Sequence, residues 1–162
     1  MTKQPRIILG IDPGYADTGW GVIAVDHNFN YLACGSITTS KALPLEQRLN
    51  QLDLELQALI KRYQPEVIAV EQLFFNTNTT TALKVAQARG VILLTAARHN
   101  LRLMELTPTQ IKLALTSDGH AAKQQVGKMV MALLHLPKLP KPDDAVDALA
   151  CAIAANSLAK RH

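Results

Sequence analysis

Residues 6–25 read RIILGIDPGYADTGWGVIAV. The run from Arg6 to Ile11 has the short apolar character of a buried strand, yet it ends in Asp12 and is followed at once by Pro13 and Gly14. A carboxylate at the end of a buried strand costs several kcal/mol, in order of magnitude, unless a cation or hydrogen bonds compensate it. The rest of the sequence should therefore show what compensates Asp12.

Length and composition bound the possible answers. A chain of 162 residues fits one domain, and we expect residues 1–162 to form it. Seventeen Lys and Arg against 13 Asp and Glu give a net charge of +4, which permits a polyanionic partner without requiring one. The two cysteines, Cys34 and Cys151, lie in apolar surroundings and are expected to be reduced core residues. No signal peptide or membrane span is recognisable, so the expected location is cytoplasmic.

The hydrophobic pattern predicts strands first and alternating strands and helices afterwards. Three strands open the chain, and we expect them to form a meander. Thr107 and Pro108 have the residue types of a helix N-cap and first turn, and Gly90 interrupts an otherwise helical pattern. The predicted strands are 6–12, 20–26, 31–37, 67–72 and 103–106, and the predicted helices are 45–62, 81–99, two stretches after 107 that separate near 116–120, and 143–161. This order predicts an α/β fold with a mixed central sheet flanked by helices.

Four carboxylates stand out against this framework. Asp12 and Glu71 each end an otherwise apolar strand, and ligands in open α/β sheets gather beyond the carboxyl ends of strands. Asp144 and Asp147 are three residues apart at the start of the last helix, which puts both side chains on one face. Four acids on one face repel one another unless cations neutralise them, and Mg²⁺ or Mn²⁺ is the natural cation for a site made of oxygen ligands.

A simpler interpretation exists for each acid taken alone. Asp-Pro-Gly is a common turn sequence, and Asp143, Asp144 and Asp147 could merely cap a helix and interact with its dipole, each contributing about 0.3–1 kcal/mol. The combination favours a metal site, because two acids at strand ends and one helical pair all fit the same face of the fold.

Four blocks of sequence carry a resemblance to a known family. They are ILGIDPGYADTGWGVI, VIAVEQLFFNTNTTTALKVAQARGV, AAKQQVGKMV and DDAVDALACAIA. In this order they resemble the signature blocks of the RuvC family, the Holliday junction resolvases with an RNase H-like fold, from about Ile7 to Ala155. The resemblance implies a homodimeric, metal-dependent endonuclease that resolves four-way DNA junctions by paired nicks in strands of like polarity, leaving 5′-phosphate and 3′-hydroxyl ends. It also implies cooperation with a branch-migration motor of the RuvA and RuvB type.

The resemblance carries over to individual acids. The family's catalytic aspartate and glutamate fall on Asp12 and Glu71, and its closing acidic pair falls on Asp144 and Asp147. Two Mg²⁺ ions, or Mn²⁺, about 3.5–4 Å apart would activate a water and stabilise the leaving 3′ oxygen. In this hypothesis Asp12 is the central ligand, Glu71 and Asp147 hold one ion each, and Asp144 positions an ion or its water.

The resemblance also suggests DNA-binding residues. Phe74 matches an aromatic wedge that could stack on an unpaired base, whereas Phe75 is assigned to packing. Lys112 and Lys123 match family positions that contact DNA near the cleavage site. Without the resemblance, a solvated lysine on a helix face is the simpler interpretation of these two residues. Further candidates for phosphate contacts are Lys84, Arg89, Lys138 and Lys141.

Two other functions must be weighed against a junction resolvase, and one residue departs from the family pattern. Actin-like kinases and ATPases also place an aspartate and glycines after a first strand, but they need two lobes and a second phosphate loop. A junction-binding protein that has lost cleavage is the non-enzymatic rival, and the presence of all four acids is an observation against it. Ser117 stands where the family usually has a glycine, so the loop 116–122 is expected to be stiffer or differently shaped.

Overall fold

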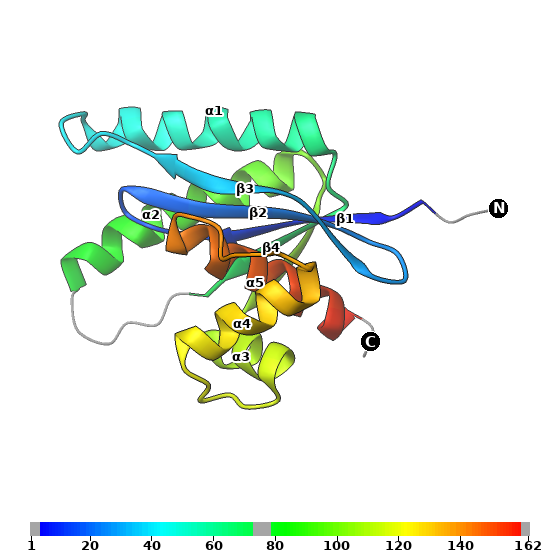
Figure 1. Ribbon diagram of the computed structural model, residues 1–162. Helices are drawn as coiled ribbons and strands as arrows, with labels where there is room; N and C mark the ends of the chain where they lie inside the picture. Colours follow the sequence, from blue (N-terminus) through cyan, green and yellow to red (C-terminus); the bar gives the residue numbers. More distant parts are fainter. Residues whose placement is uncertain (1–3, 73–78, 160–162) are drawn as a thin grey trace.

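The computed structural model describes residues 4–72 and 79–159. Figure 1 shows the elements in chain order. They are β1 (Arg6–Asp12), β2 (Asp17–Val25), β3 (Phe29–Thr38), α1 (Leu45–Tyr63), β4 (Val67–Glu71), α2 (Thr79–Arg98), β5 (Arg102–Leu106), α3 (Pro108–Thr116), α4 (Lys123–Leu134) and α5 (Asp143–Ala159).

The five strands form one mixed sheet in the order β3-β2-β1-β4-β5. β1 pairs antiparallel with β2, and β2 pairs antiparallel with β3, which confirms the predicted meander. β4 and β5 then add in parallel to β1, so the carboxyl ends of β1 and β4 lie side by side at one edge of the molecule.

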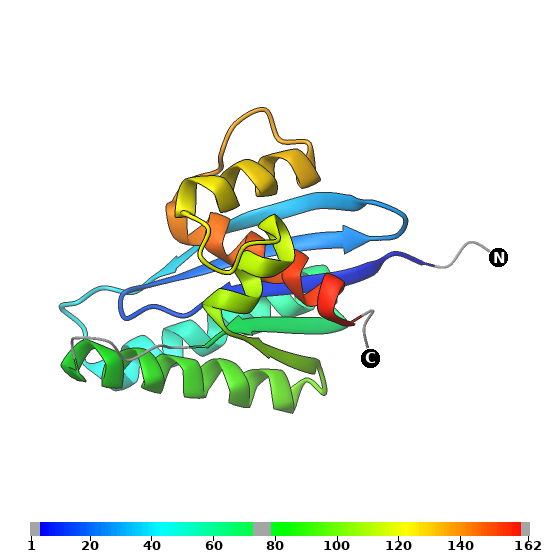
Figure 2. The same ribbon diagram turned by 90° about the horizontal axis from the view of Figure 1, so that it is seen from below.

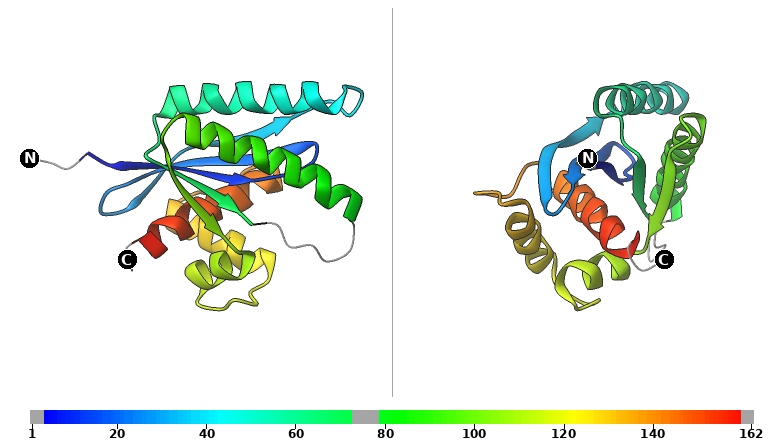
Figure 3. Two further views of the ribbon diagram at one scale, coloured as in Figure 1. Left: turned by 180° about the vertical axis from the view of Figure 1, so that it is seen from behind. Right: turned by 90° about the vertical axis from the view of Figure 1, so that its right-hand side faces the viewer.

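Helices cover both faces of the sheet. α1 and α2 lie on one face, whereas α5 crosses the other face with α3 and α4 on its outer side, as the end-on view in Figure 3 shows. Figure 2, the view from below, shows α5 passing in front of the strands with α4 beside it. Each face encloses its own hydrophobic cluster. Among the described residues, no helix has both the length and the apolarity that crossing a membrane requires.

Two details differ from the sequence-based expectation, and a third bears on the departure from the family pattern. α2 is continuous through Gly90, because a glycine costs a helix only about 1 kcal/mol and the neighbouring Ala88 and Ile92 are buried. Cys151 is buried as expected, but Cys34 is only partly buried, and both thiols are free. Ser117 ends α3 in the left-handed conformation, with φ 61°, which explains why a glycine suits this position.

Candidate active site

The pleat of the sheet directs two carboxylates towards α5. Along β1, Leu9 and Ile11 pack on the α1 and α2 side, whereas Ile8 packs on the α5 side. Because successive side chains alternate between faces, Asp12 falls on the α5 face. The same alternation holds along β4, where Val67 and Ala69 pack on the α5 side, so Glu71 also faces α5.

Glycines in the sheet allow α5 to approach the strands closely. A Cβ added at Gly10 would lie 2.0 Å from the carbonyl oxygen of Ala148, and one added at Gly19 would lie 2.1 Å from that of Asp144. Gly19 is the register partner of Asp12 across the β1–β2 pair. The backbone of Asp144 is therefore held against the strand that flanks Asp12, and Figure 1 shows the first turn of α5 (orange) beside the end of β1.

The acids meet at this edge. Asp12, Asp144 and Asp147 each offer a carboxylate oxygen, and these oxygens all lie within 4.8 Å of one another. Glu71 lies beside them, since a hydrogen bond with Asp12 and the charge of Asp147 both act on its carboxyl group. Residues from β1, β4 and α5 thus form one acidic cluster, and it contains all four acids that the sequence singles out.

Burial and mutual repulsion raise the pKa values of the cluster. Burial is the largest cause for Asp12, and the charges of Glu71, Asp147 and Asp144 add to it, so that its pKa rises to about 8. Burial and the charge of Asp147 likewise raise the pKa of Glu71 and of Asp144. At neutral pH the protein without metal therefore retains a proton on Asp12 that a bound cation would displace.

Two lysines accompany the acids. The Nζ of Lys123, on α4, lies 2.9 Å from Oδ2 of Asp147, and this hydrogen bond raises the pKa of the lysine. Lys112, on α3, and Lys123 line an adjoining cavity of about 230 Å³ together with Glu71 and Asp147. The cavity's other walls are apolar, so a negatively charged ligand entering it would meet both ammonium groups beside the acids.

The donor set fits a divalent cation. Carboxylate oxygens that converge from three elements are the ligands that Mg²⁺ and Mn²⁺ prefer. Burial and, after it, the repulsion between the acids raise the pKa of Asp12 and of Asp144, and the charge of Lys123, which is 62% exposed, does not offset these effects. A divalent cation would remove that repulsion, which is the compensation that Asp12 requires.

The remaining sequence candidates lie in different settings. Lys84 is partly buried and places its Nζ 3.3 Å from the hydroxyl of Tyr15, whereas Arg89 forms an ion pair with Glu105. The charged groups of Lys84 and Arg89 therefore already contact other side chains of the protein. Lys138 and Lys141 are exposed. Phe74 and Phe75 lie outside the described residues.

The sequence analysis overlooked Arg48. Its side chain is only 3% exposed and contacts the turn that follows Asp12. The signal was present in the helical pattern, because Arg48 lies three residues after Leu45 and four before Leu52, on the apolar stripe of α1. A charged residue on a buried stripe is informative, since arginine is rarely fully buried without a partner.

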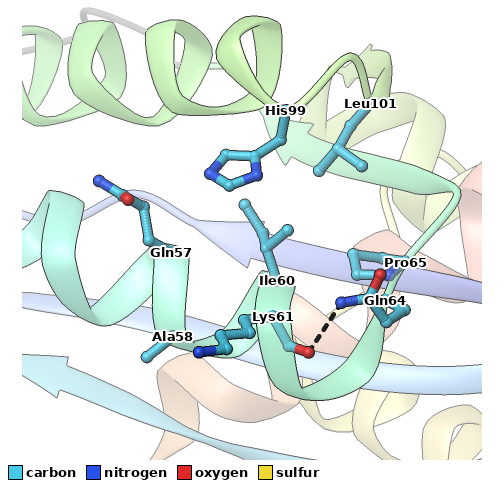
Figure 4. A pocket seen from close by; sticks show the side chains of 8 residues that line it. All are labelled: Gln57, Ala58, Ile60, Lys61, Gln64, Pro65, His99 and Leu101. Carbon is cyan, nitrogen blue, oxygen red and sulfur yellow. Dashed lines mark hydrogen bonds between the residues drawn. The ribbon is translucent and has the colours of Figure 1, made fainter.

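A second cavity, of about 370 Å³, lies at the opposite end of the sheet, where β4 and β5 begin. Figure 4 shows Ile60, His99 and Leu101 around it, with Gln64 donating a hydrogen bond to the carbonyl of Lys61. Its lining residues include no carboxylate, in contrast to the cavity beside the acidic cluster.

Comparison with known proteins identifies the family. The family described as "Crossover junction endodeoxyribonuclease RuvC" matches residues 8–155. The chain belongs to the RuvC family. The members of this family are nucleases, so the family and the enzyme class predicted from the sequence are both confirmed.

Individual relatives agree over nearly the whole chain. The crossover junction endodeoxyribonuclease RuvC of Rubrobacter xylanophilus is 51% identical over 154 residues, which cover 94% of this chain and 85% of the relative. The structure of Thermus thermophilus RuvC matches with a TM-score of 0.90 at 33% identity, covering 96% of both chains. The same protein in complex with a Holliday junction substrate matches with a TM-score of 0.88 at 32% identity and the same coverage. These matches confirm the predicted RNase H-like α/β fold.

Proposed function

We propose that this chain is a metal-dependent endonuclease that resolves four-way DNA junctions. The observation that carries the proposal is the convergence of Asp12, Glu71, Asp144 and Asp147 from β1, β4 and α5. Membership of the RuvC family supports the substrate, since the T. thermophilus relative binds a Holliday junction. The products would be symmetric paired nicks with 5′-phosphate and 3′-hydroxyl ends.

The four acids would hold two Mg²⁺ ions, and Mn²⁺ would serve as well. Bound there, the ions would supply an activated water and a stabilising charge for the leaving 3′ oxygen. The charges of Glu71, Asp147 and Asp144 all act on Asp12, so Asp12 would be shared between the two ions, while Glu71 and Asp147 would hold one ion each. Asp144 would orient an ion or its water.

Lysines beside the acids would bind the scissile strand. Lys112 and Lys123 line the same cavity as Glu71 and Asp147, so a phosphate held by their ammonium groups would lie next to the carboxylates. We assign Phe74 the role of stacking on an unpaired base at the crossover. Lys84 and Arg89 would contribute little directly, because their charged groups already contact Tyr15 and Glu105.

Paired nicks require two active sites, so we propose that the chain acts as a homodimer on one junction. Resolution at a chosen position further requires that the junction move, and the family resemblance suggests a branch-migration motor of the RuvA and RuvB type as a partner. Both proposals rest on membership of the RuvC family.

The decisive experiment is cleavage of a labelled, mobile four-way junction by the purified protein in Mg²⁺. We expect symmetric nicks that disappear in EDTA and in Asp12→Asn, while Asp12→Asn still binds the junction tightly. Asp143→Asn is the matched control, because Asp143 is exposed, adjoins Asp144 and is not among the three aspartates whose oxygens converge. An excess of linear duplex should not compete.

Two results would contradict this proposal. Tight junction binding by the wild-type chain without nicks in either Mg²⁺ or Mn²⁺ would identify the non-enzymatic rival, a junction-binding protein that does not cleave. Failure of the wild-type chain to prefer the junction over linear duplex would remove the junction as its substrate.

A further inference from the structure

The turn that follows Asp12 is held in one conformation by several close contacts. A Cβ added at Gly14 would lie 1.8 Å from the carbonyl oxygen of Asp17, so the turn closes tightly on its glycine. The backbone N–H of Thr39 donates to the carbonyl of Ala16 at 2.8 Å. The peptide groups of this turn are thus fixed from the β3 side. Pro13, which joins the turn to Asp12, is itself buried.

Arg48 holds the same turn from the α1 side. Its Nη2 donates to the carbonyl of Tyr15 at 2.6 Å, and its Nε donates to Oγ1 of Thr39 at 3.1 Å. The guanidinium carbon also lies 4.2 Å from the centroid of the Tyr15 ring. One planar side chain therefore joins the turn after β1 to the residue that follows β3.

The burial of Arg48 is costly. Only 3% of its surface is exposed, and among residues 4–72 and 79–159 no carboxylate lies within ion-pair distance of it. Leu45, Leu49 and Leu52 line the same narrow cavity beside it. Replacing a buried charged group by an apolar one of similar size is often neutral or stabilising, so stability alone does not account for an arginine here.

We propose that Arg48 is a positioning residue for the acidic cluster. By fixing the carbonyl of Tyr15, it fixes the turn, and through the rigid Pro13 it holds the Asp12 carboxylate where it meets Asp144 and Asp147. Arg48 acts through Asp12 and touches neither DNA nor metal. The inference rests on the proposed function, because it assigns Arg48 a task in building that same metal site.

The test compares Arg48→Met with the wild-type chain. Methionine keeps an unbranched apolar stem but lacks the guanidinium group, so it removes both hydrogen bonds. We expect the affinity for Mn²⁺, measured by calorimetry without DNA, and the kcat of junction cleavage each to fall about 10-fold or more, as for other groups that orient metal ligands. The junction affinity and KM should not change. Arg48→Lys keeps the charge without the fork of donors and should recover only part of the loss.

Matched variants separate positioning from stability. Arg62→Met alters an exposed arginine on the same helix, which contacts only the Tyr63 ring among the described residues, and should behave as wild type. Should Arg48→Met not fold, Thr39→Val decides the question, because it removes the acceptor of Nε while keeping the backbone N–H that binds Ala16. Thr39→Val should then lower Mn²⁺ affinity in a folded protein.

The outcomes separate this inference from the proposed function. If the wild-type chain neither binds Mn²⁺ nor cleaves junctions, the proposed function fails and the inference fails with it. If the wild-type chain does both, and folded Arg48→Met or Thr39→Val loses only thermal stability while Mn²⁺ affinity and kcat stay at wild-type values, Arg48 is merely structural and the inference alone is overturned.

Discussion

At the scale of single residues, the position of an acid was more informative than its identity. Asp12 and Glu71 could be selected from the sequence because each ends an apolar strand, and the pleat of the sheet then carries both to the α5 face. Arg48 could not be assigned a task in the same way. Its partners are a backbone carbonyl 33 residues away and a hydroxyl nine residues away, and no sequence pattern encodes such contacts.

The raised pKa of Asp12 predicts how stability depends on pH without metal. The folded protein holds this proton up to about pH 8, whereas the unfolded chain loses it near the ordinary value of 3.8. The folded state therefore binds more protons between these values, and the free energy of unfolding should fall as pH rises from about 4 to 8. Thermal unfolding in EDTA at pH 5 and pH 8 measures this change.

Asp12→Asn is the control for that prediction. It removes the titrating group and one charge from the cluster, so its melting temperature should fall less steeply over the same pH range. Adding Mg²⁺ at pH 8 should restore the wild-type melting temperature far more than that of the variant, because a ligand that binds only the folded state stabilises it. Identical pH profiles for the two proteins would contradict a raised pKa at Asp12.

At the scale of elements, the sequence predicted the order of strands and helices but not how closely they pack. Gly10 fell inside a predicted strand and Gly19 just before one, and only the topology, which places α5 directly over both, showed why a glycine stands there. Gly90, by contrast, looked like an interruption, yet α2 continues through it with open space around its Cα. The meaning of a glycine depends on its neighbour across the fold, which the chain order alone does not specify.

This contrast gives a matched pair of substitutions. Gly19→Ala should displace the start of α5, cost about 1–3 kcal/mol as overpacked sites do, and reduce junction cleavage by separating Asp144 from Asp12. Gly90→Ala should instead stabilise the protein by about 0.5–1 kcal/mol and leave cleavage unchanged. Chemical denaturation and the junction assay measure both effects. Wild-type cleavage by Gly19→Ala would show that the approach of α5 does not set the site.

At the scale of the whole molecule, charge is distributed unevenly. The chain carries a net charge of +4, yet one end of its sheet gathers four carboxylates. Lys112 and Lys123 lie beside them, so a DNA strand bound there would contact cations while its phosphate approached the acids. The net charge follows from the sequence, but the placement of the two lysines beside the four acids becomes visible only in the folded structure.

The charge distribution predicts that the salt dependence of junction affinity arises at the end of the sheet that carries the acidic cluster. Junction affinity should fall linearly with salt on a double logarithmic plot, and each lost phosphate contact should lower the slope by about 0.9. Lys112→Ala should reduce the slope. Lys61→Ala is the control, since Lys61 lines the cavity at the opposite end of the sheet. Equal slopes for the wild type and Lys112→Ala would remove Lys112 from the DNA interface.

The acidic cluster joins the first strand of the fold to its last helix. During synthesis Asp12 leaves the ribosome early, whereas Asp144 and Asp147 follow only when most of the chain has been made. Nascent proteins begin to fold from the N-terminal side, so the β-meander can form while α5 is still missing. A chain that stops before α5 therefore lacks two of the four acids of the cluster, and under the proposed function such a chain should not cleave DNA.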